Sequence, residues 1–267
     1  MRARKRFGQH FLEAAWVAKL VDVVRPCPTD TFLEIGAGRG ALTQALAPRI
    51  KRLVAIEIDR DLAAELSAVV GGNVRVVEAD VLDVDFAALL TDETLPVRVI
   101  GNLPYNISSP ILFRLLDSHQ EARRFSDATL MLQGEVADRL VAPRGGADYG
   151  VLAIQTAVHA DVARLLTLPP GAFRPPPKVT SAVVSLRFHP PAVERGDPSA
   201  FERLVRGVFT QRRKTLLNAL RPVTGLDVAG IRRVLQGVGV DPNRRPQTLT
   251  VDEMGQLALA LQRDRHP

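Results

Sequence analysis

Apolar residues in the first two thirds of the chain come in short runs, and most of these runs end in glycine, asparagine or an acid. Runs of this length, bounded by turn residues, predict buried strands, and apolar residues at helical spacing between them predict helices. Strands that alternate with helices predict an α/β fold. The expected strands lie within residues 31–35, 53–59, 74–80, 97–100, 128–132, 162–168 and 181–188, and the expected helices include 14–24 and 41–46.

The pattern changes in the last third of the chain. Residues 190–198 are rich in proline and are typical of a linker, and beyond them apolar residues recur only at helical spacing. Thr250 and Glu253 have the spacing of a capping box that opens a helix through Leu261. The other apolar positions are Phe201, Leu204, Val205, Val208, Phe209, Leu216, Leu217, Leu220, Ile231, Val234 and Leu235. We therefore expect a small all-α domain at the C-terminus.

A glycine-rich turn follows the first expected strand, and acids end the next two. Gly36 and Gly38 permit positive φ and let a ligand approach the backbone closely. Glu57 lies 21 positions after Gly36, the spacing at which a carboxylate meets a ribose diol in folds of this type. Asp80 ends the following strand and is placed to accept a hydrogen bond from an adenine amine. The pattern suits a nicotinamide dinucleotide or S-adenosylmethionine.

Two considerations favour S-adenosylmethionine over a dinucleotide. Carboxylates at two successive strand ends would repel a pyrophosphate. The sequence also has no Tyr-x-x-x-Lys pair and no well-placed histidine for the proton transfer that a dinucleotide oxidoreductase needs. Methyl transfer needs neither, because the sulfonium is a good leaving group and the protein mainly supplies position, desolvation and acceptors for the amine.

The string Asn102-Leu103-Pro104-Tyr105 follows the fourth expected strand, where open α/β sheets bind their ligands. Asparagine supplies an amide oxygen, proline has a carbonyl but no N–H, and tyrosine offers a stacking face. Such a cluster of acceptors suits a planar ring with an exocyclic amine, such as adenine. A proline turn with a packing tyrosine explains the string equally well when it is taken alone. Ser109 and Pro110 are expected to be the N-cap and first position of the next helix.

Composition narrows the class of protein. The 267 residues are 46% hydrophobic and 24% charged, which is ordinary for a soluble globular protein. No apolar run approaches the roughly 20 residues that span a bilayer, and no apolar segment follows the basic start, so we expect a cytoplasmic protein. The single cysteine, Cys27, cannot form an internal disulfide, and the five histidines lack metal-ligand spacing. We therefore expect no metal site.

The charge is unevenly distributed. Residues 151–267 contain 17 Lys and Arg against 9 Asp and Glu, a net charge of +8, whereas residues 1–150 have a net charge of −2. A basic part of this kind indicates a polyanionic partner, most simply nucleic acid, although solvated arginine-rich faces are also common. Residues 1–12 form a basic arm, in which Phe7, Phe11 and Leu12 require burial, so the segment after Arg6 is expected to dock on the body.

Six strings along the chain resemble the motifs of the RNA adenine-N6 dimethyltransferases in their order and spacing. They are Arg6–Leu12, Glu34–Gly40, Ala55–Asp59, Glu78–Leu82, Asn102–Pro110 and Phe173–Val184. The resemblance covers nearly the whole chain. It implies a Rossmann-like α/β fold of the class I methyltransferase type, with a seven-stranded, mostly parallel sheet that contains one reversed strand. It also implies a methyltransferase catalytic domain in residues 1–190 and a helical RNA-binding and ribosome-binding domain in residues 191–267.

The resemblance assigns roles to particular residues. It implies S-adenosylmethionine as cofactor, with contacts from His10, Leu12, Gly36, Gly38, Glu57, Asp80 and Asn102. Asn102 and a main-chain carbonyl of Leu103 or Pro104 would accept the two N–H groups of the target adenine, while Tyr105 and Phe173 would stack on its ring. Phe173 as a core residue is an equally weighted alternative.

The string Gln211-Arg212-Arg213-Lys214 resembles the small-subunit members of this family. It implies dimethylation of N6 of two adjacent adenosines in a loop near the 3′ end of small-subunit (16S) ribosomal RNA, within a precursor of the 30S subunit. Nothing in the sequence suggests more than a monomer. Expected phosphate contacts are Arg2, Arg4, Lys5, Arg6, Arg212, Arg213 and Lys214. The alternatives are a large-subunit (23S) dimethyltransferase of the antibiotic-resistance type and a non-catalytic ribosome-assembly factor. Gln247 stands where the family more often has glutamate. This difference weakens at most a contact in the segment that leads into the next helix.

Overall fold

The computed structural model describes residues 10–265, and the chain divides into two compact units. The first unit comprises residues 1–137 and 161–190, and the second comprises residues 138–160 and 191–267. One division therefore falls at residue 190, where the linker is expected. The segment 138–160 groups with the C-terminal helices instead of with the sheet that surrounds it in sequence.

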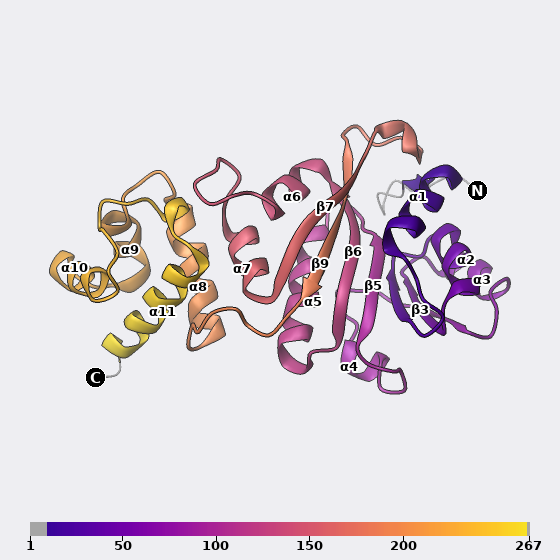
Figure 1. Ribbon diagram of the computed structural model, residues 1–267, viewed down its shortest axis with the longest axis horizontal. Coiled ribbons are helices and arrows are strands. Elements are labelled where there is room, and N and C mark those ends of the chain that lie inside the picture. The colour runs from indigo at the N-terminus through magenta and orange to yellow at the C-terminus, as the bar shows by residue number, and fades with distance from the viewer. Residues whose placement is uncertain (1–9, 266–267) are drawn as a thin grey trace. The chain divides into compact units, whose positions relative to one another are not determined.

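The first unit is built on a seven-stranded sheet with the order β4-β3-β2-β5-β6-β9-β7. Its strands are β2 (Thr31–Ile35), β3 (Arg52–Glu57), β4 (Val74–Glu78), β5 (Val97–Asn102), β6 (Phe125–Gln133), β7 (Ala160–Leu168) and β9 (Ser181–Phe188). The pairs β3–β4, β2–β3, β2–β5 and β5–β6 are parallel, whereas β9 runs antiparallel to β6. Figure 1 shows the strands from β7 through β9, β6 and β5 toward β3. The expected α/β architecture with a reversed strand is confirmed.

Helices cover this sheet, and a small second sheet lies beside it. The helices are α1 (Ala14–Val24), α2 (Ala41–Leu46), α3 (Arg60–Ser67), α4 (Phe86–Leu89) and α5 (Ser108–Ala122), with a 3-10 turn at Ala47–Arg49. Helix α6 (Gly134–Leu140) crosses the division between the units. A second sheet pairs β1 (Phe11–Leu12) with β8 (Phe173–Arg174), after a 3-10 turn at Pro170–Ala172. Leu20 and Val21 of α1 pack with Leu46 of α2 and Phe32 of β2, so the apolar face of α1 forms part of the core.

The expected start of helix α5 was wrong by two residues. Ile107 is the N-cap, its carbonyl accepts the first helical bond from the N–H of Ile111 at 3.0 Å, and no side chain caps the helix. The chain turns early because the N–H of Ile107 already bonds to the carbonyl of Pro104 at 3.1 Å. Pro110 therefore occupies the third helical position, where the missing N–H still costs nothing because the first four have no helical acceptor. Ser109 lies inside the helix.

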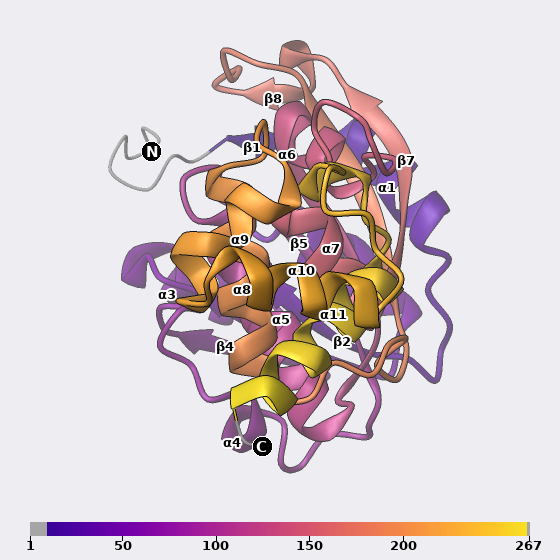
Figure 2. The ribbon, with the colours of Figure 1, turned by 90° about the vertical axis from the view of Figure 1, so that its left-hand side faces the viewer.

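The second unit is all helical. Its elements are α7 (Val151–His159), α8 (Pro198–Thr210), α9 (Leu216–Thr224), α10 (Val228–Gly237), a 3-10 turn at Pro246–Thr248 and α11 (Val251–Arg265). Figure 2 shows α8 to α11 grouped together in orange and yellow. Ile154 and Val158 of α7 are fully buried in the core that these helices share, which explains why α7 belongs to this unit. The side chains of Thr250 and Glu253 accept each other's backbone N–H, as expected for a capping box, although α11 continues beyond Leu261.

Candidate active site

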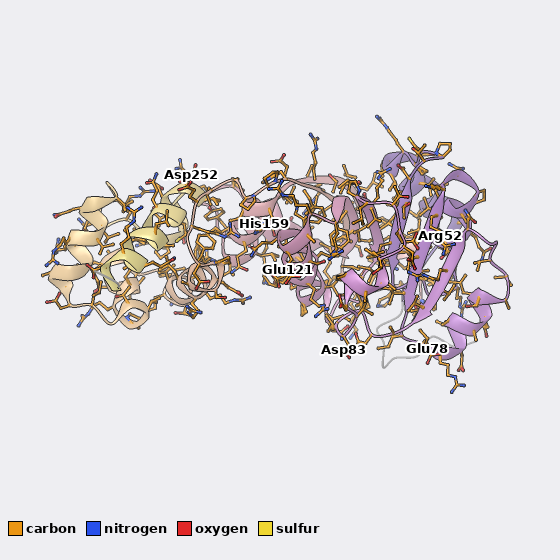
Figure 3. The ribbon with its side chains drawn as sticks, turned by 90° about the horizontal axis from the view of Figure 1, so that it is seen from below. Arg52, Glu78, Asp83, Glu121, His159 and Asp252 are labelled. Carbon is orange, nitrogen blue, oxygen red and sulfur yellow. The ribbon has the colours of Figure 1, made fainter. Side chains whose placement is uncertain are left out.

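A pocket of about 520 Å³ opens at the carboxyl ends of β2, β3, β4 and β5. Glu78, the last residue of β4, lies at this end of the parallel strands, and Arg52, the first residue of β3, lies at the opposite end (Figure 3). The volume is within the range of small-molecule and cofactor sites. All of the predicted cofactor and catalytic residues except Phe173 line the pocket: His10, Leu12, Gly36, Gly38, Glu57, Asp80, Asn102, Leu103, Pro104 and Tyr105. The fold thus gathers residues that lie far apart in sequence.

The glycine turn and the carboxylate of Glu57 form one hydrogen-bonded unit. Gly36 and Gly38 have φ of +75° and +56°, which side chains rarely adopt. The N–H of Gly38 donates to Oε2 of Glu57 at 2.7 Å, and the N–H of Asp59 donates to Oε1 at 2.9 Å. A Cβ at position 38 would also come within 3.2 Å of the Phe11 ring. The carboxylate is therefore fixed in the pocket wall, with lone pairs left for a ligand.

Asp80 supplies a second carboxylate from the neighbouring strand end. One of its oxygens accepts the N–H of Leu82 at 2.9 Å, and the side chain is partly exposed. No lysine or arginine among the described residues forms an ion pair with Asp80 or Glu57. Two unneutralised carboxylates can bind hydroxyl and amine donors and oppose a phosphate. The chemistry of this part of the pocket therefore fits a ribose and an adenine without phosphates.

Glu34 is a third acid of the pocket that the sequence analysis did not single out. It is 2% exposed, and burial raises the pKa of its carboxyl to about 8, with nearby Glu57 adding to the shift. The hydroxyl of Thr43 donates to its Oε2 at 2.7 Å. Glu34 is therefore neutral at pH 7, unlike an exposed glutamate. Its only signal in the sequence was its place before the glycine turn.

Asn102 is oriented by a backbone carbonyl. Its Nδ2 donates to the carbonyl of His10 at 2.7 Å, and this contact fixes the amide because its oxygen would be repelled there. The side-chain oxygen of Asn102 remains as an acceptor. His10 is held in turn by a 2.7 Å hydrogen bond between its Nδ1 and the carbonyl of Pro175. Nδ1 carries the proton in this bond, because a carbonyl can only accept.

The β1–β8 sheet forms part of the pocket wall through contacts that the sequence did not reveal. Arg174 forms an ion pair with Glu13, and the N–H of Glu13 donates to the carbonyl of Ala172 at 2.9 Å. The Arg39 guanidinium lies 4.4 Å from the centre of the Phe11 ring. The partners of Glu13 lie more than 150 positions away in the sequence, so neither spacing nor local pattern could have paired them.

Tyr105 makes contacts through both its hydroxyl group and its ring face. Its hydroxyl is hydrogen-bonded to Oγ of Ser181 at 2.5 Å, and its ring stacks on the imidazole of His10, with centroids 5.5 Å apart and planes inclined by 27°. Burial raises the pKa of Tyr105, and the Ser181 hydrogen bond partly offsets that rise. The stack shows that the Tyr105 face accepts a planar polar ring.

Phe173 is placed differently from Tyr105. Its side chain is 2% exposed and packs in the core of the first unit with Leu168, Ala172 and Val183. It does not line the pocket. The structure therefore does not bring Phe173 opposite Tyr105, and its assignment as a second stacking face stays a prediction that requires the side chain to move.

The basic string of the second unit contains residues with different surroundings. Arg212 is half-buried; its guanidinium donates to the carbonyl of Ala147 and, at 3.4 Å, to the side-chain oxygen of Gln247. Arg213 and Lys214 are exposed in the turn between α8 and α9. The other expected phosphate contacts lie outside the described residues: Arg2, Arg4, Lys5 and Arg6.

Two more basic residues lie on loops that are hydrogen-bonded to this turn. Arg144 and Arg245 are both exposed, and the N–H of Gly145 donates to the carbonyl of Gln247 at 2.8 Å. Arg144 is isolated in the sequence and Arg245 has only Arg244 beside it, so neither was predicted as a phosphate contact. Within residues 10–265, no helix is long and apolar enough to cross a membrane, and no cluster of His, Cys, Asp or Glu has the arrangement of a metal site.

Comparisons with known proteins agree over nearly the full chain. The family model of the ribosomal RNA adenine dimethylases matches residues 1–261. The ribosomal RNA small subunit methyltransferase A of Syntrophotalea carbinolica is 45% identical over 263 residues, which is 98% of this chain and 97% of the relative. The protein of the same name from Aromatoleum aromaticum is 46% identical over 255 residues, covering 94% and 91%.

Solved structures support the same conclusion about the fold. A dimethyladenosine transferase from Plasmodium falciparum has a TM-score of 0.81 at 25% identity and covers 96% of this chain and 98% of that chain. The 23S rRNA methyltransferase ErmE has a TM-score of 0.66 at 26% identity and covers 94% and 99%. The small-subunit relatives are more similar in sequence, and the Plasmodium enzyme is more similar in structure than ErmE.

Proposed function

Since this chain belongs to the ribosomal RNA adenine dimethylase family and is a methyltransferase, we propose that it dimethylates N6 of two adjacent adenosines near the 3′ end of small-subunit ribosomal RNA. The choice of the small subunit is supported by relatives of 45–46% identity that are named small-subunit methyltransferases. The observation that carries the proposal is the pocket, which combines a glycine turn, two carboxylates that form no ion pair within residues 10–265, and an acceptor loop beside a tyrosine ring.

The methyl donor is proposed to be S-adenosylmethionine, as the family implies in general. When bound, this cofactor supplies a methyl group on a sulfonium that leaves readily. The residues present fit it: Glu57 would bind the ribose hydroxyls and Asp80 the adenine amine, while Gly36 and Gly38 leave room at the backbone. His10, Leu12 and Asn102 are proposed to complete the cofactor site.

The target adenine is proposed to stack on Tyr105 with its amine at the acceptor loop. The side-chain oxygen of Asn102 and a carbonyl of Leu103 or Pro104 would accept the two N–H groups, which favours a pyramidal nitrogen aimed at the methyl carbon. Stacking on an aromatic ring contributes about 1–3 kcal/mol per base. No general base is needed before transfer, because the amine proton becomes acidic only after methylation. Phe173 would add a second face after a side-chain movement.

The RNA is proposed to be held mainly through its phosphates. Arg213 and Lys214 are exposed, which suits such contacts, and the basic arm of residues 1–12 would add to them. The expected substrate is a precursor of the small ribosomal subunit, bound by a monomer. A cytoplasmic location follows from that substrate.

The proposal is tested with an Asn102→Ala variant on unmethylated small subunits. We expect both methyl transfers to slow about 100-fold, because the loss of one positioned hydrogen-bonding group typically costs that much, while RNA binding is retained. Nucleoside mass spectrometry over a time course measures both products. An Asn102→Ala variant that methylates at the wild-type rate would show that the acceptor mechanism is wrong.

Two further measurements separate the alternatives. Primer extension across the small-subunit and large-subunit sites, with RNA from a strain that lacks this protein, identifies the substrate; retained small-subunit marks would exclude our choice. Calorimetry with S-adenosylmethionine tests the non-catalytic alternative, because the absence of binding heat in a folded protein would favour an RNA-binding factor without activity.

A further inference from the structure

The orientation of the Tyr105 ring is set from its far end. Tyr105 lies in the loop between β5 and α5, outside any regular element. The first side-chain torsion of tyrosine has three staggered minima, and each directs the ring axis differently, so the loop alone does not fix the position of the ring. Within residues 10–265, its hydroxyl is hydrogen-bonded to Ser181, 76 positions along the chain.

Ser181 is well suited to hold that hydroxyl in place. It is the first residue of β9, it is paired with Gln133 of β6, and it is 0% exposed. The carbonyl of the preceding residue, Thr180, accepts the N–H of Gly134 at 2.9 Å, which fixes this end of the strand. A hydroxyl on a buried, doubly anchored backbone moves little, so it can serve as a reference point for the loop opposite.

From this geometry we infer that Ser181 is a positioning residue, which holds the Tyr105 ring in the position where the target base stacks on it. The inference rests on the proposed function. Tyr105 touches the base, and Ser181 acts only through Tyr105. The His10 ring stacks on one face of Tyr105 in this structure. At a centroid separation of 5.5 Å no third ring fits between them, so the base must displace His10 or use the other face.

A double-mutant cycle isolates this role. Ser181→Ala removes the anchor, and Tyr105→Phe removes the hydroxyl but keeps the stacking ring. Each change should slow the second methyl transfer about fivefold. After the first methylation the adenine amine has only one N–H left, so the position of the adenine depends more on stacking against Tyr105. The double variant should be no slower than either single variant, since both remove the same bond. The KM for small subunits should not change.

A spectroscopic readout tests the contact without catalysis. The chain has two tyrosines, so tyrosine labelled with ¹³C at Cζ gives two resonances, which a Tyr149→Phe variant assigns. Ser181→Ala should shift the Tyr105 resonance and leave that of Tyr149 unchanged. The matched control is Ser185→Ala, on the same strand four residues further, which should change neither the resonance nor the rate.

The outcomes separate this inference from the proposed function. A wild-type protein that does not methylate small subunits overturns the proposed function and the inference with it. An active wild type with a Ser181→Ala variant of equal rate overturns the inference alone. So does an unmoved Tyr105 resonance, or a double variant whose defect is the product of the two single defects. If Ser181→Ala fails to fold, Tyr105→Phe tests the same bond from its other side, and a wild-type rate there rejects it.

Discussion

The pocket of the first unit and the basic turn of the second unit were both predicted from short strings of residues. In each of the two sites, the structure buries or pairs some of the predicted residues and leaves others accessible. Of the two residues predicted to stack on the target base, Tyr105 lines the pocket, whereas Phe173 is buried in the core. In the basic string, Arg213 is exposed, whereas the guanidinium of Arg212 is bound by the protein itself. The difference shows that a residue can bind a ligand only if the fold leaves its side chain accessible and its hydrogen-bonding groups free of protein partners.

The largest effect is expected at the buried aromatic residue. Phe173→Ala should lower the free energy of unfolding by about 3–5 kcal/mol, as for a large side chain removed from a core, and Tyr105→Ala should lower it far less. Tyr105→Ala should instead let monomethyladenine accumulate, because the second transfer depends on stacking. Urea unfolding and nucleoside mass spectrometry measure the two effects.

Phe173→Leu separates the two possible roles of Phe173, because leucine retains most of the core volume but offers no aromatic face. A stable Phe173→Leu variant that accumulates monomethyladenine would show that Phe173 reaches the base during the reaction. A stable variant with normal product ratios would show that the phenyl ring serves only the core.

The second largest effect is expected at Glu34, whose carboxyl group is buried. Its pKa is about 8 in the folded protein against 4.5 as the ordinary value, so the unfolded chain ionises it first as the pH rises. The stability that the neutral carboxyl provides is complete below pH 4.5 and is lost as the pH rises toward 8, by an amount on the order of 3 kcal/mol at pH 7. Glu34→Gln should remove this loss.

Urea unfolding at pH 5 and pH 8 measures it. The unfolding free energy of Glu34→Gln should fall less than that of the wild type between these pH values, while the control Glu65→Gln, at an exposed position on α3, should follow the wild type. Equal slopes for the wild type and Glu34→Gln would mean that Glu34 is ionised in the fold.

The sequence predicted the elements and the pocket well for a physical reason. Strand ends of a parallel sheet converge, so acids and glycines at those ends, such as Gly36, Glu57 and Asp80, had to meet. The sequence could not predict features that depend on contacts between distant segments. The burial of Phe173, the Ser181 anchor and the bond between Asn102 and the His10 carbonyl each require the folded coordinates. The start of α5 was wrong because Ser-Pro is a good local signal that the earlier turn at Pro104 overrode.

The third effect compares the neighbouring arginines. Arg213→Gln should lower the salt slope of RNA binding by roughly one unit, as expected for one lost phosphate contact, with little change in stability. Arg212→Gln should leave the slope nearly unchanged and lower the unfolding free energy by about 0.5–1.5 kcal/mol, because it removes the hydrogen bond to the exposed carbonyl of Ala147, which water can then satisfy. Binding to small-subunit RNA at several salt concentrations, together with thermal unfolding, measures both. Equal slopes for the two variants would remove the distinction drawn here.

The smallest effect is expected at Gln247, where the family more often has glutamate. Its side-chain oxygen accepts from Arg212 at 3.4 Å, so Gln247→Glu would convert a neutral contact into an ion pair. A partly exposed pair of this kind is worth about 0.2–1 kcal/mol, so the melting temperature should rise slightly. The added negative charge near Arg213 and Lys214 should weaken RNA binding about twofold at low salt and less at high salt.

The opposite signs of these two changes make the test decisive. Stability and RNA affinity both depend on the same turn, but only stability gains from neutralising Arg212, whereas affinity depends on the net positive charge that the exposed residues present. Glutamine at position 247 therefore leaves the turn more basic and less tightly held than glutamate would. A Gln247→Glu variant that lost both stability and affinity would show that the substitution distorts the turn. It would also show that the side chain at position 247 does not pair with Arg212. A gain in both would show that RNA binding is limited by the order of the turn instead of by its charge.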